Sequence, residues 1–315
     1  MQFRVRTWQI SLLVVVVCLG TWGYLEWTRR RADLSDEALY RRLPLDRVVQ
    51  VYVNVQQMRS AGMLDLLVGS RAVEELDYKR FIDDTAFDYR QDLDVVMGAF
   101  AKNRSLFLLK GRFDWDRIRK WAESRGVKCV NGYCGGDNAR TGRSVSFFML
   151  FPTVMAVGIG EDTNAAYDLQ IVRNLPSGAG MPSQPFWIRL PSSVLEDPQS
   201  LPSGTRAFAS GVKGAERVTL GVGPGGEAFE IEMQAIFKND QQAADGRKYL
   251  QEMTDTLQAF FRRDKQQPNP NDLSGVLVSG QFTHQGTRLI GKWPIRWQFL
   301  EAIAGSKSIA EDPKP

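Results

Sequence analysis

The stretch LDVVMGAFAKNRSLFLLK, residues 93–110, carries the clearest fold signal in the chain. Two apolar runs of strand length, 93–100 and 105–110, flank the polar turn Lys102-Asn103-Arg104. Runs of this length joined by a short polar connection are typical of a β-hairpin. The sequence therefore predicts antiparallel strands here.

Strand and helix patterns alternate on both sides of this hairpin, and the same succession of strand, helix and strand pair recurs after a loop rich in Pro, Gly and Ser at 176–185. This pattern predicts an α+β fold of two diverged repeats with mainly antiparallel sheets. The further strands are expected at 48–55, 145–150, 154–159, 186–190, 206–212, 217–222, 228–237, 276–282 and 288–293. The helices are expected at 56–68, 71–85, 114–126, 162–172, 240–263 and from Pro294 through 303.

The domain boundaries follow from these patterns. We expect a cytoplasmic tip and transmembrane anchor at 1–31, a charged linker at 32–47 and a flexible tail at 306–315. The first α+β half is expected at 48–183 and the second at 184–305.

The segment WQISLLVVVVCLGTWGYLEW, residues 8–27, is long and apolar enough to cross a bilayer as a helix, with tryptophans near both ends. A cleaved signal peptide, a lipoprotein signal and a buried core helix are the alternatives. Val17 before Cys18 argues against the lipoprotein signal, and the run lacks a small-residue cleavage site. We therefore expect an uncleaved single-pass anchor in the cytoplasmic membrane.

The basic residues that flank this segment, two before it and three after it, leave its orientation open. A short N-terminal tail before a large domain favours a domain outside the cytoplasm, periplasmic or extracellular.

Composition excludes several classes of function. The 40 basic and 36 acidic residues are spread along the chain, so nucleic acid is not an expected partner. One histidine and three cysteines leave few ways to build a zinc site or a nucleophile–histidine pair. We expect neither a metal nor a cofactor.

The densest acidic stretch runs from Asp83 to Asp94 and is followed by Phe113-Asp114-Trp115-Asp116. A carboxylate-dependent extracytoplasmic hydrolase could use two carboxylates from this stretch, one of them with a raised pKa. The alternative is that these side chains cap helices and pair with nearby arginines. The candidate residues are Asp88, Asp92, Asp94, Asp114 and Asp116.

Three further motifs have structural interpretations. His284 is expected at the tip of a hairpin, and the glycine-rich run 221–226 is expected to be a hairpin turn because Pro224 breaks a phosphate-loop pattern. The tryptophans of Lys292-Trp293-Pro294-Ile295-Arg296-Trp297 suit either a membrane surface or the core, and we favour the core.

Cys129 and Cys134 enclose Val130-Asn131-Gly132-Tyr133. Asn-Gly favours a two-residue hairpin loop, because both central residues of a type I′ turn need positive φ. The two cysteines would then face each other as a non-hydrogen-bonded pair, close enough for a disulfide. Free thiols are the alternative. A disulfide would indicate an oxidising compartment.

The phrases at 87–94 and 111–115, followed by the two cysteines, resemble a group of uncharacterised membrane-anchored bacterial proteins of the acidobacterial type. The resemblance covers roughly residues 44–172. It implies an extracytoplasmic domain of unknown function and transfers no catalytic residue.

These observations favour a membrane-anchored binding or scaffold protein over an enzyme. The membrane, through the N-terminal helix, and a protein of unknown identity, such as a larger membrane complex, are the expected partners.

Overall fold

The computed structural model describes residues 34–64, 76–138, 142–175, 180–196, 206–225, 228–265, 267–269 and 272–300. The strands are β1 (Val49–Asn54), β2 (Leu93–Phe100), β3 (Arg104–Gly111), β4 (Lys128–Val130), β5 (Tyr133–Asn138), β6 (Arg143–Phe151), β7 (Val154–Gly160), β8 (Phe186–Pro191), β9 (Arg217–Gly225), β10 (Ala228–Ile236), β11 (Gln281–Gln285) and β12 (Arg288–Ile295). The helices are α2 (Asp36–Tyr40), α3 (Val55–Ser60), α5 (Leu76–Thr85), α6 (Tyr89–Asp92), α7 (Trp115–Ser124), the 3₁₀ helix η2 (Ala165–Gln170), α8 (Ser192–Leu195), α9 (Arg206–Ser210), α10 (Asp240–Arg263) and α11 (Leu273–Leu277).

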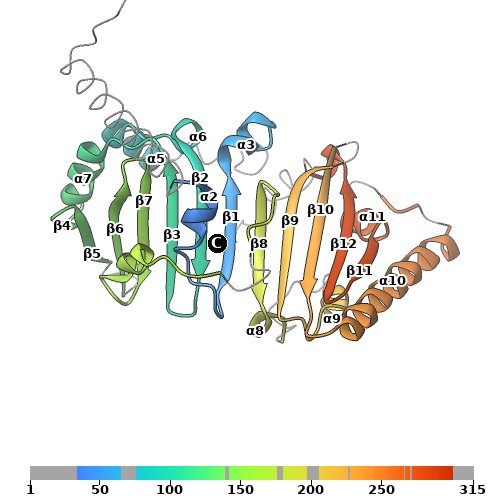
Figure 1. The fold of residues 1–315 in the computed structure, drawn as a ribbon. Coiled ribbons are helices and arrows are strands. Elements are labelled where there is room, and N and C mark those ends of the chain that lie inside the picture. Colours follow the sequence, from blue (N-terminus) through green and yellow to red (C-terminus); the bar gives the residue numbers. More distant parts are fainter. Residues whose placement is uncertain are drawn as a thin grey trace, which may run out of the picture.

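The strands form one twelve-stranded sheet in the order β11-β12-β10-β9-β8-β1-β2-β3-β7-β6-β5-β4 (Figure 1). Every neighbouring pair is antiparallel. The predicted α+β class with antiparallel pairing is confirmed, and so is the hairpin of β2 and β3.

The central pairing joins β1 to β8, with Val51 opposite Ile188 and Gln50 opposite Arg189. This pairing makes a single sheet from strands that come from both halves of the sequence.

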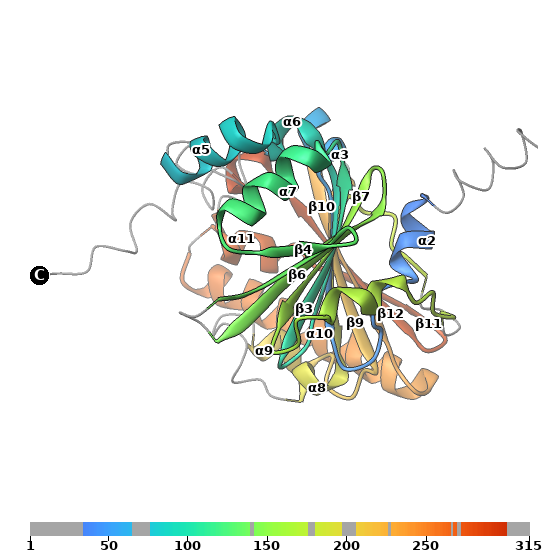
Figure 2. The same ribbon diagram turned by 90° about the vertical axis from the view of Figure 1, so that its left-hand side faces the viewer.

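The sheet has a front face, which bears Trp187 and Met97, and a back face, which bears Leu220 and Phe107. Side chains alternate between the faces along each strand, and residues directly opposite each other on neighbouring strands share a face. Helix α2 lies on one side of the sheet, and α7 and α11 lie on the other (Figure 2).

The front face of the first half carries a filled core. Trp187 is fully buried, stacks on Tyr52 at 5.5 Å between ring centroids and meets Tyr40 edge to face. Leu39 and Leu43, from the segment around α2, are also buried. The stretch 32–47, expected to be a linker, therefore contributes part of this core, because it contains an apolar helical stripe among its charges.

The back face of the second half is covered by α8, α9, α10 and α11. Helix α10 begins at Asn239, whose side chain accepts a hydrogen bond from the Gln242 amide, as an N-cap residue does. Gly246 is needed where α10 crosses the end of α9, since a Cβ there would lie 2.7 Å from the Gly211 carbonyl oxygen.

The predicted strand at 206–212 is wrong, because residues Arg206–Ser210 form α9. The two alanines of this segment favour helix over strand. The expected helix at 162–172 is a 3₁₀ helix, η2, over Ala165–Gln170.

The strand predicted at 276–282 is wrong in its first part, because Val276 and Leu277 belong to α11. The Asp272 carboxylate caps this helix by accepting hydrogen bonds from the amides of Ser274 and Gly275. Pro294 belongs to β12 rather than opening a helix, and the apolar alternation of that strand continues to the buried Ile295.

The expected anchor at 8–27 and the tail at 306–315 lie outside the described residues. Among the described helices, none is both long enough and apolar enough to cross a bilayer.

Candidate apolar binding pocket

A pocket of about 350 Å³ lies on the back face of the second half, between the sheet and its helices. Strands β8, β9, β10 and β12 form the floor, and α8 to α11 with their flanking residues form the roof. Every lining side chain is apolar. The lining consists of Leu190, Leu195, Ala209, Val212, Val218, Leu220, Ile231, Met233, Leu250, Leu273, Val276, Leu277 and Trp293.

Strand alternation explains the floor. Val218 and Leu220 on β9, and Ile231 and Met233 on β10, are two residues apart, so each pair points to the same face of the sheet. Trp293 is opposite Ile231 on β12 and is 6% exposed. Because side chains alternate between the two faces along each strand, the charged residues of these strands lie on the front face.

Two polar contacts hold the roof in place. The Asp272 cap fixes the start of α11, and the hydrogen bond from the Ser274 hydroxyl lowers the pKa of the Asp272 carboxyl. Gln258 on α10 donates through Nε2 to the Val278 carbonyl at 2.8 Å, which joins α10 to the end of α11. Leu273 lines the pocket yet is 44% exposed, so we place the mouth of the pocket at the start of α11.

The pocket wall contains a buried donor without an acceptor. The Trp293 indole Nε1 has no hydrogen-bond partner among the described residues. An unpaired buried N–H of this kind costs about 1–3 kcal/mol.

A larger hollow of about 640 Å³ lies on the front face, where Arg47, Arg189 and Arg217 are mixed with Asp46 and Glu216. Arg189 is 7% exposed, and burial lowers the pKa of its guanidinium. It donates to the hydroxyls of Thr219 and Tyr40 and to the Gly180 carbonyl. Because these contacts tie β8 to β9, to α2 and to the loop before β8, Arg189 serves as a structural anchor.

Four of the five candidate aspartates form local structural contacts. Asp88 caps α6 and accepts a hydrogen bond from the Tyr78 hydroxyl at 3.0 Å. Asp92 accepts from the Asp88 amide and pairs with Arg112 at 3.1 Å.

Asp114 caps α7, and Asp116 pairs with Arg119 at 2.8 Å on the same helix. Asp94 lies half-buried in β2. This arrangement provides no observation in favour of carboxylate catalysis. Among the residues that the structure describes, no group of three or more His, Cys, Asp or Glu side chains is placed to hold a metal ion.

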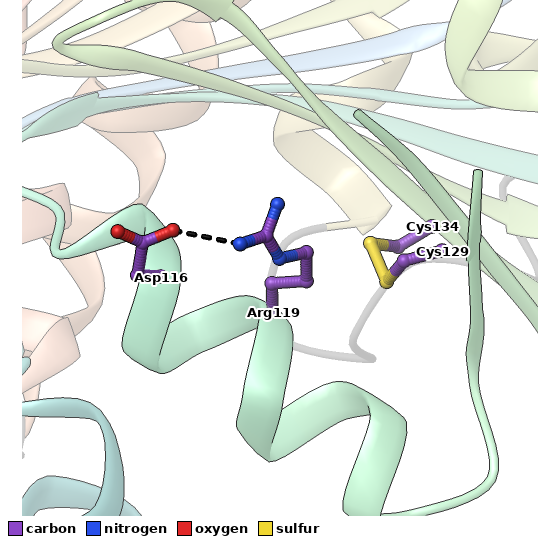
Figure 3. The surroundings of a disulfide bond; sticks show 4 residues. All are labelled: Asp116, Arg119, Cys129 and Cys134. Atoms are coloured by element: carbon purple, nitrogen blue, oxygen red, sulfur yellow. Dashed lines mark hydrogen bonds and ion pairs between the residues drawn. A yellow bond between two sulfur atoms is a disulfide. The ribbon is translucent and has the colours of Figure 1, made fainter. Parts of the chain in front are cut away.

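The Cys129 and Cys134 sulfurs lie at bonding distance, 2.01 Å, in the β4–β5 hairpin. Asn131 and Gly132 have φ angles of 52° and 80°, as the predicted two-residue loop requires. The disulfide points toward α7, where Asp116 and Arg119 form their ion pair (Figure 3). The predicted register, with the two cysteines opposite each other, is confirmed.

The remaining motifs fall in the second half. His284 lies within β11, two residues before the turn at Gly286, and its Nε2 is 3.8 Å from an Asp240 carboxylate oxygen. The glycine-rich run leads from β9 into β10, as a hairpin. Trp293 and Trp297 pack in or against the core rather than on an exposed surface.

Sequence reasoning missed the pocket. Its floor could have been found from the alternation Val218-Leu220 and Ile231-Met233, which marks one apolar face. Its roof could not, because the sequence pattern predicts strands over α9 and over the end of α11.

No family model matches the chain, and no curated protein matches it significantly. The chain is similar in structure to TP0453 in crystal form I, with 13% identity and a TM-score of 0.45 over 87% of this chain and 98% of TP0453. Crystal forms III and IV of TP0453 give TM-scores of 0.42 and 0.41 at 12% identity, each over 85% of this chain and over 96% and 95% of TP0453. Likeness at this level identifies neither a family nor a function.

Proposed function

We propose that this chain is a membrane-tethered binding protein whose extracytoplasmic α+β domain holds a small apolar ligand in the pocket between the sheet and α8 to α11. The observation that carries the proposal is the lining of that pocket. About 350 Å³ of space is lined by apolar side chains alone. Ligand pockets are typically about 300–1,000 Å³ and mostly apolar.

Water is a poor occupant of such a space. A buried water needs two to four polar partners, and an apolar cavity of about 150 Å³ stays dry and binds benzene. The pocket here has more than twice that volume. Filling it with hydrocarbon would restore the dispersion contacts that the lining side chains lack.

The location and the partners are part of the proposal. The apolar segment 8–27 supports a membrane tether, and the cysteine pair at bonding distance supports an oxidising compartment. A protein partner in a larger membrane complex fits the same location, with the bound ligand passed to or received from that complex.

We infer further that the two halves are diverged repeats. The order β1-β2-β3-β7-β6 in the first half has the same connectivity as β8-β9-β10-β12-β11 in the second. The two sets meet at the antiparallel pair β1 and β8. This correspondence supports duplication of one α+β unit, of which the second copy became hollow.

Photolabelling tests the proposed binding function. Full-length protein in native membranes would be irradiated with a short alkyl diazirine, and the adducts would be mapped by peptide mass spectrometry. We expect saturable labelling on β10 and α11 that excess unlabelled alkane suppresses. Labelling confined to residues 8–27, with none in the pocket, would contradict the proposal.

Variants at Ile231, a lining residue on β10, provide the matched control. Ile231→Trp fills the pocket and should reduce labelling there about tenfold, because the probe loses its space. Ile231→Ala enlarges the pocket and should leave labelling equal or stronger. Equal labelling of both variants would place the probe elsewhere.

A further inference from the structure

A continuous row of apolar residues crosses the back face beyond the pocket. The pairing registers place Met233, Leu220, Ile188, Val51, Gly98, Phe107, Val157 and Phe147 directly opposite one another on successive strands. Met233 and Leu220 are part of the pocket floor. The row therefore continues from the floor across the β1–β8 junction into the first half.

The middle of this row is not packed into a core. Among the described residues, the buried side chains form three clusters. Five residues of the row belong to none of them: Ile188, Val51, Phe107, Val157 and Phe147. Each of these five side chains is partly exposed, and Phe100, on the same face as Phe107, is 38% exposed. A contiguous apolar surface that is only partly covered is a candidate binding site.

Gly98 shapes the row at its centre. A Cβ at this position would lie 3.0 Å from the Phe100 ring and 3.3 Å from the Phe107 ring. The two rings meet edge to face at 5.3 Å between centroids. The glycine thus lets both rings lie close to the backbone and form a smooth apolar floor.

Resting on the pocket proposed above, we propose that the ligand is the long unbranched hydrocarbon chain of a lipid, with one end in the pocket and the remainder along the row to Phe107 and beyond. Strands are about 4.8 Å apart, so the path from Met233 on β10 to Phe147 on β6 is roughly 34 Å long. A compact ligand would use the pocket alone. A linear chain occupies both the pocket and the row, and it covers the partly exposed side chains of the row.

Two diazirine-bearing lipid chains separate the pocket from the row. Full-length protein in native membranes would be labelled with a long-chain fatty acid that carries the diazirine at its methyl end or at mid-chain. We expect one probe to label the pocket peptides of β10 and α11, and the other to label β3 or β7. The short alkyl probe should label the pocket alone.

Variants at Phe107 test the row directly. Phe107→Gln should reduce labelling by the long chains about tenfold, because one aromatic contact is lost, and should leave the short probe unchanged. Phe107→Leu keeps the floor apolar and should restore labelling. Phe260→Gln, a change of the same type at a ring that is 48% exposed on α10, should alter neither probe.

The outcomes distinguish the two proposals. Pocket labelling by all probes, with no adducts on β3 or β7 and no effect of Phe107→Gln, would overturn the extended site and keep the pocket. No pocket labelling by any probe would overturn both. A fall in sedimenting mass for Phe107→Gln, from dimer to monomer, would show that a second copy covers the row and would also overturn the extended site.

Discussion

The front face of the first half and the back face of the second half are two cores on one sheet, and they are filled differently. Around Trp187, the side chains of Leu39, Tyr40 and Leu43 pack against the strands and are fully buried. Around Trp293, a comparable set of apolar side chains lines an open space of about 350 Å³. The filled core supplies stability, whereas the hollow core gives up contacts and keeps the space in which we propose that a ligand binds.

Replacing each tryptophan by alanine tests this difference in packing, and it has the largest expected effect on the free energy of unfolding. Trp187→Ala should lower the free energy of unfolding by about 3–5 kcal/mol, since it opens a cavity in a filled core. Trp293→Ala should cost roughly 1–2 kcal/mol less, because its side chain already borders empty space. Urea unfolding of the full-length chain in mild detergent measures both.

Phenylalanine at each position serves as the control. Both indole Nε1 groups are buried without a hydrogen-bond partner among the described residues, so Trp→Phe removes an unsatisfied donor at either site. Equal costs for the two alanine variants would mean that the second core is as well packed as the first.

The disulfide tests whether the two edges of the sheet, β4 with β5 and β11 with β12, unfold separately. Reduction of Cys129–Cys134 should lower stability by about 2 kcal/mol, the loop-closure value for so short a loop. Hydrogen exchange should accelerate in β4 and β5 and stay unchanged in β11 and β12. Acceleration in both regions would show that the two halves unfold as one unit. Thiol labelling of unreduced protein from intact cells checks that the bond forms there.

Asp272→Ala gives the smallest effect, and it acts on the roof of the hollow core. Loss of the α11 cap should cost about 1 kcal/mol, and Asp272→Asn, which still accepts hydrogen bonds, should cost less. The lowered pKa of Asp272 predicts that its contribution is complete above the unfolded aspartate pKa, about 4, and is lost as the pH falls through the folded value. The free energy of unfolding should be measured between pH 7 and pH 3. The difference between the unaltered protein and Asp272→Ala should shrink as the pH falls, whereas the difference between Asp272→Asn and Asp272→Ala should not depend on pH.

The sequence predicted those parts of the fold that local signals determine. The turn at Asn131-Gly132, the cap at Asp114 and the β2–β3 hairpin all depend on neighbouring residues. Each of these signals resides within a few positions, so periodicity and turn chemistry identify it.

Other parts depend on contacts distant in sequence. The segment 206–212 contains Phe208 and Val212, which suit a strand, yet it forms α9 in contact with α10. The pocket depends on how α9, α10 and α11 are spaced above the sheet. No local pattern encodes that spacing, so the candidate site could not be predicted.

The pairing of β1 with β8 has a consequence for the order of folding. Gln50 and Arg189 are opposite each other in the finished sheet, so the chain must be synthesised as far as residue 189 before β1 gains its second neighbour. Until then, the strand VQVYVN presents an open, β-branched edge of the kind that pairs readily with other chains. Contacts of such long sequence separation form slowly. We therefore expect chains truncated before residue 186 to aggregate. Pairing of β1 with β8 is then the step after which a newly made molecule no longer exposes this edge to other chains.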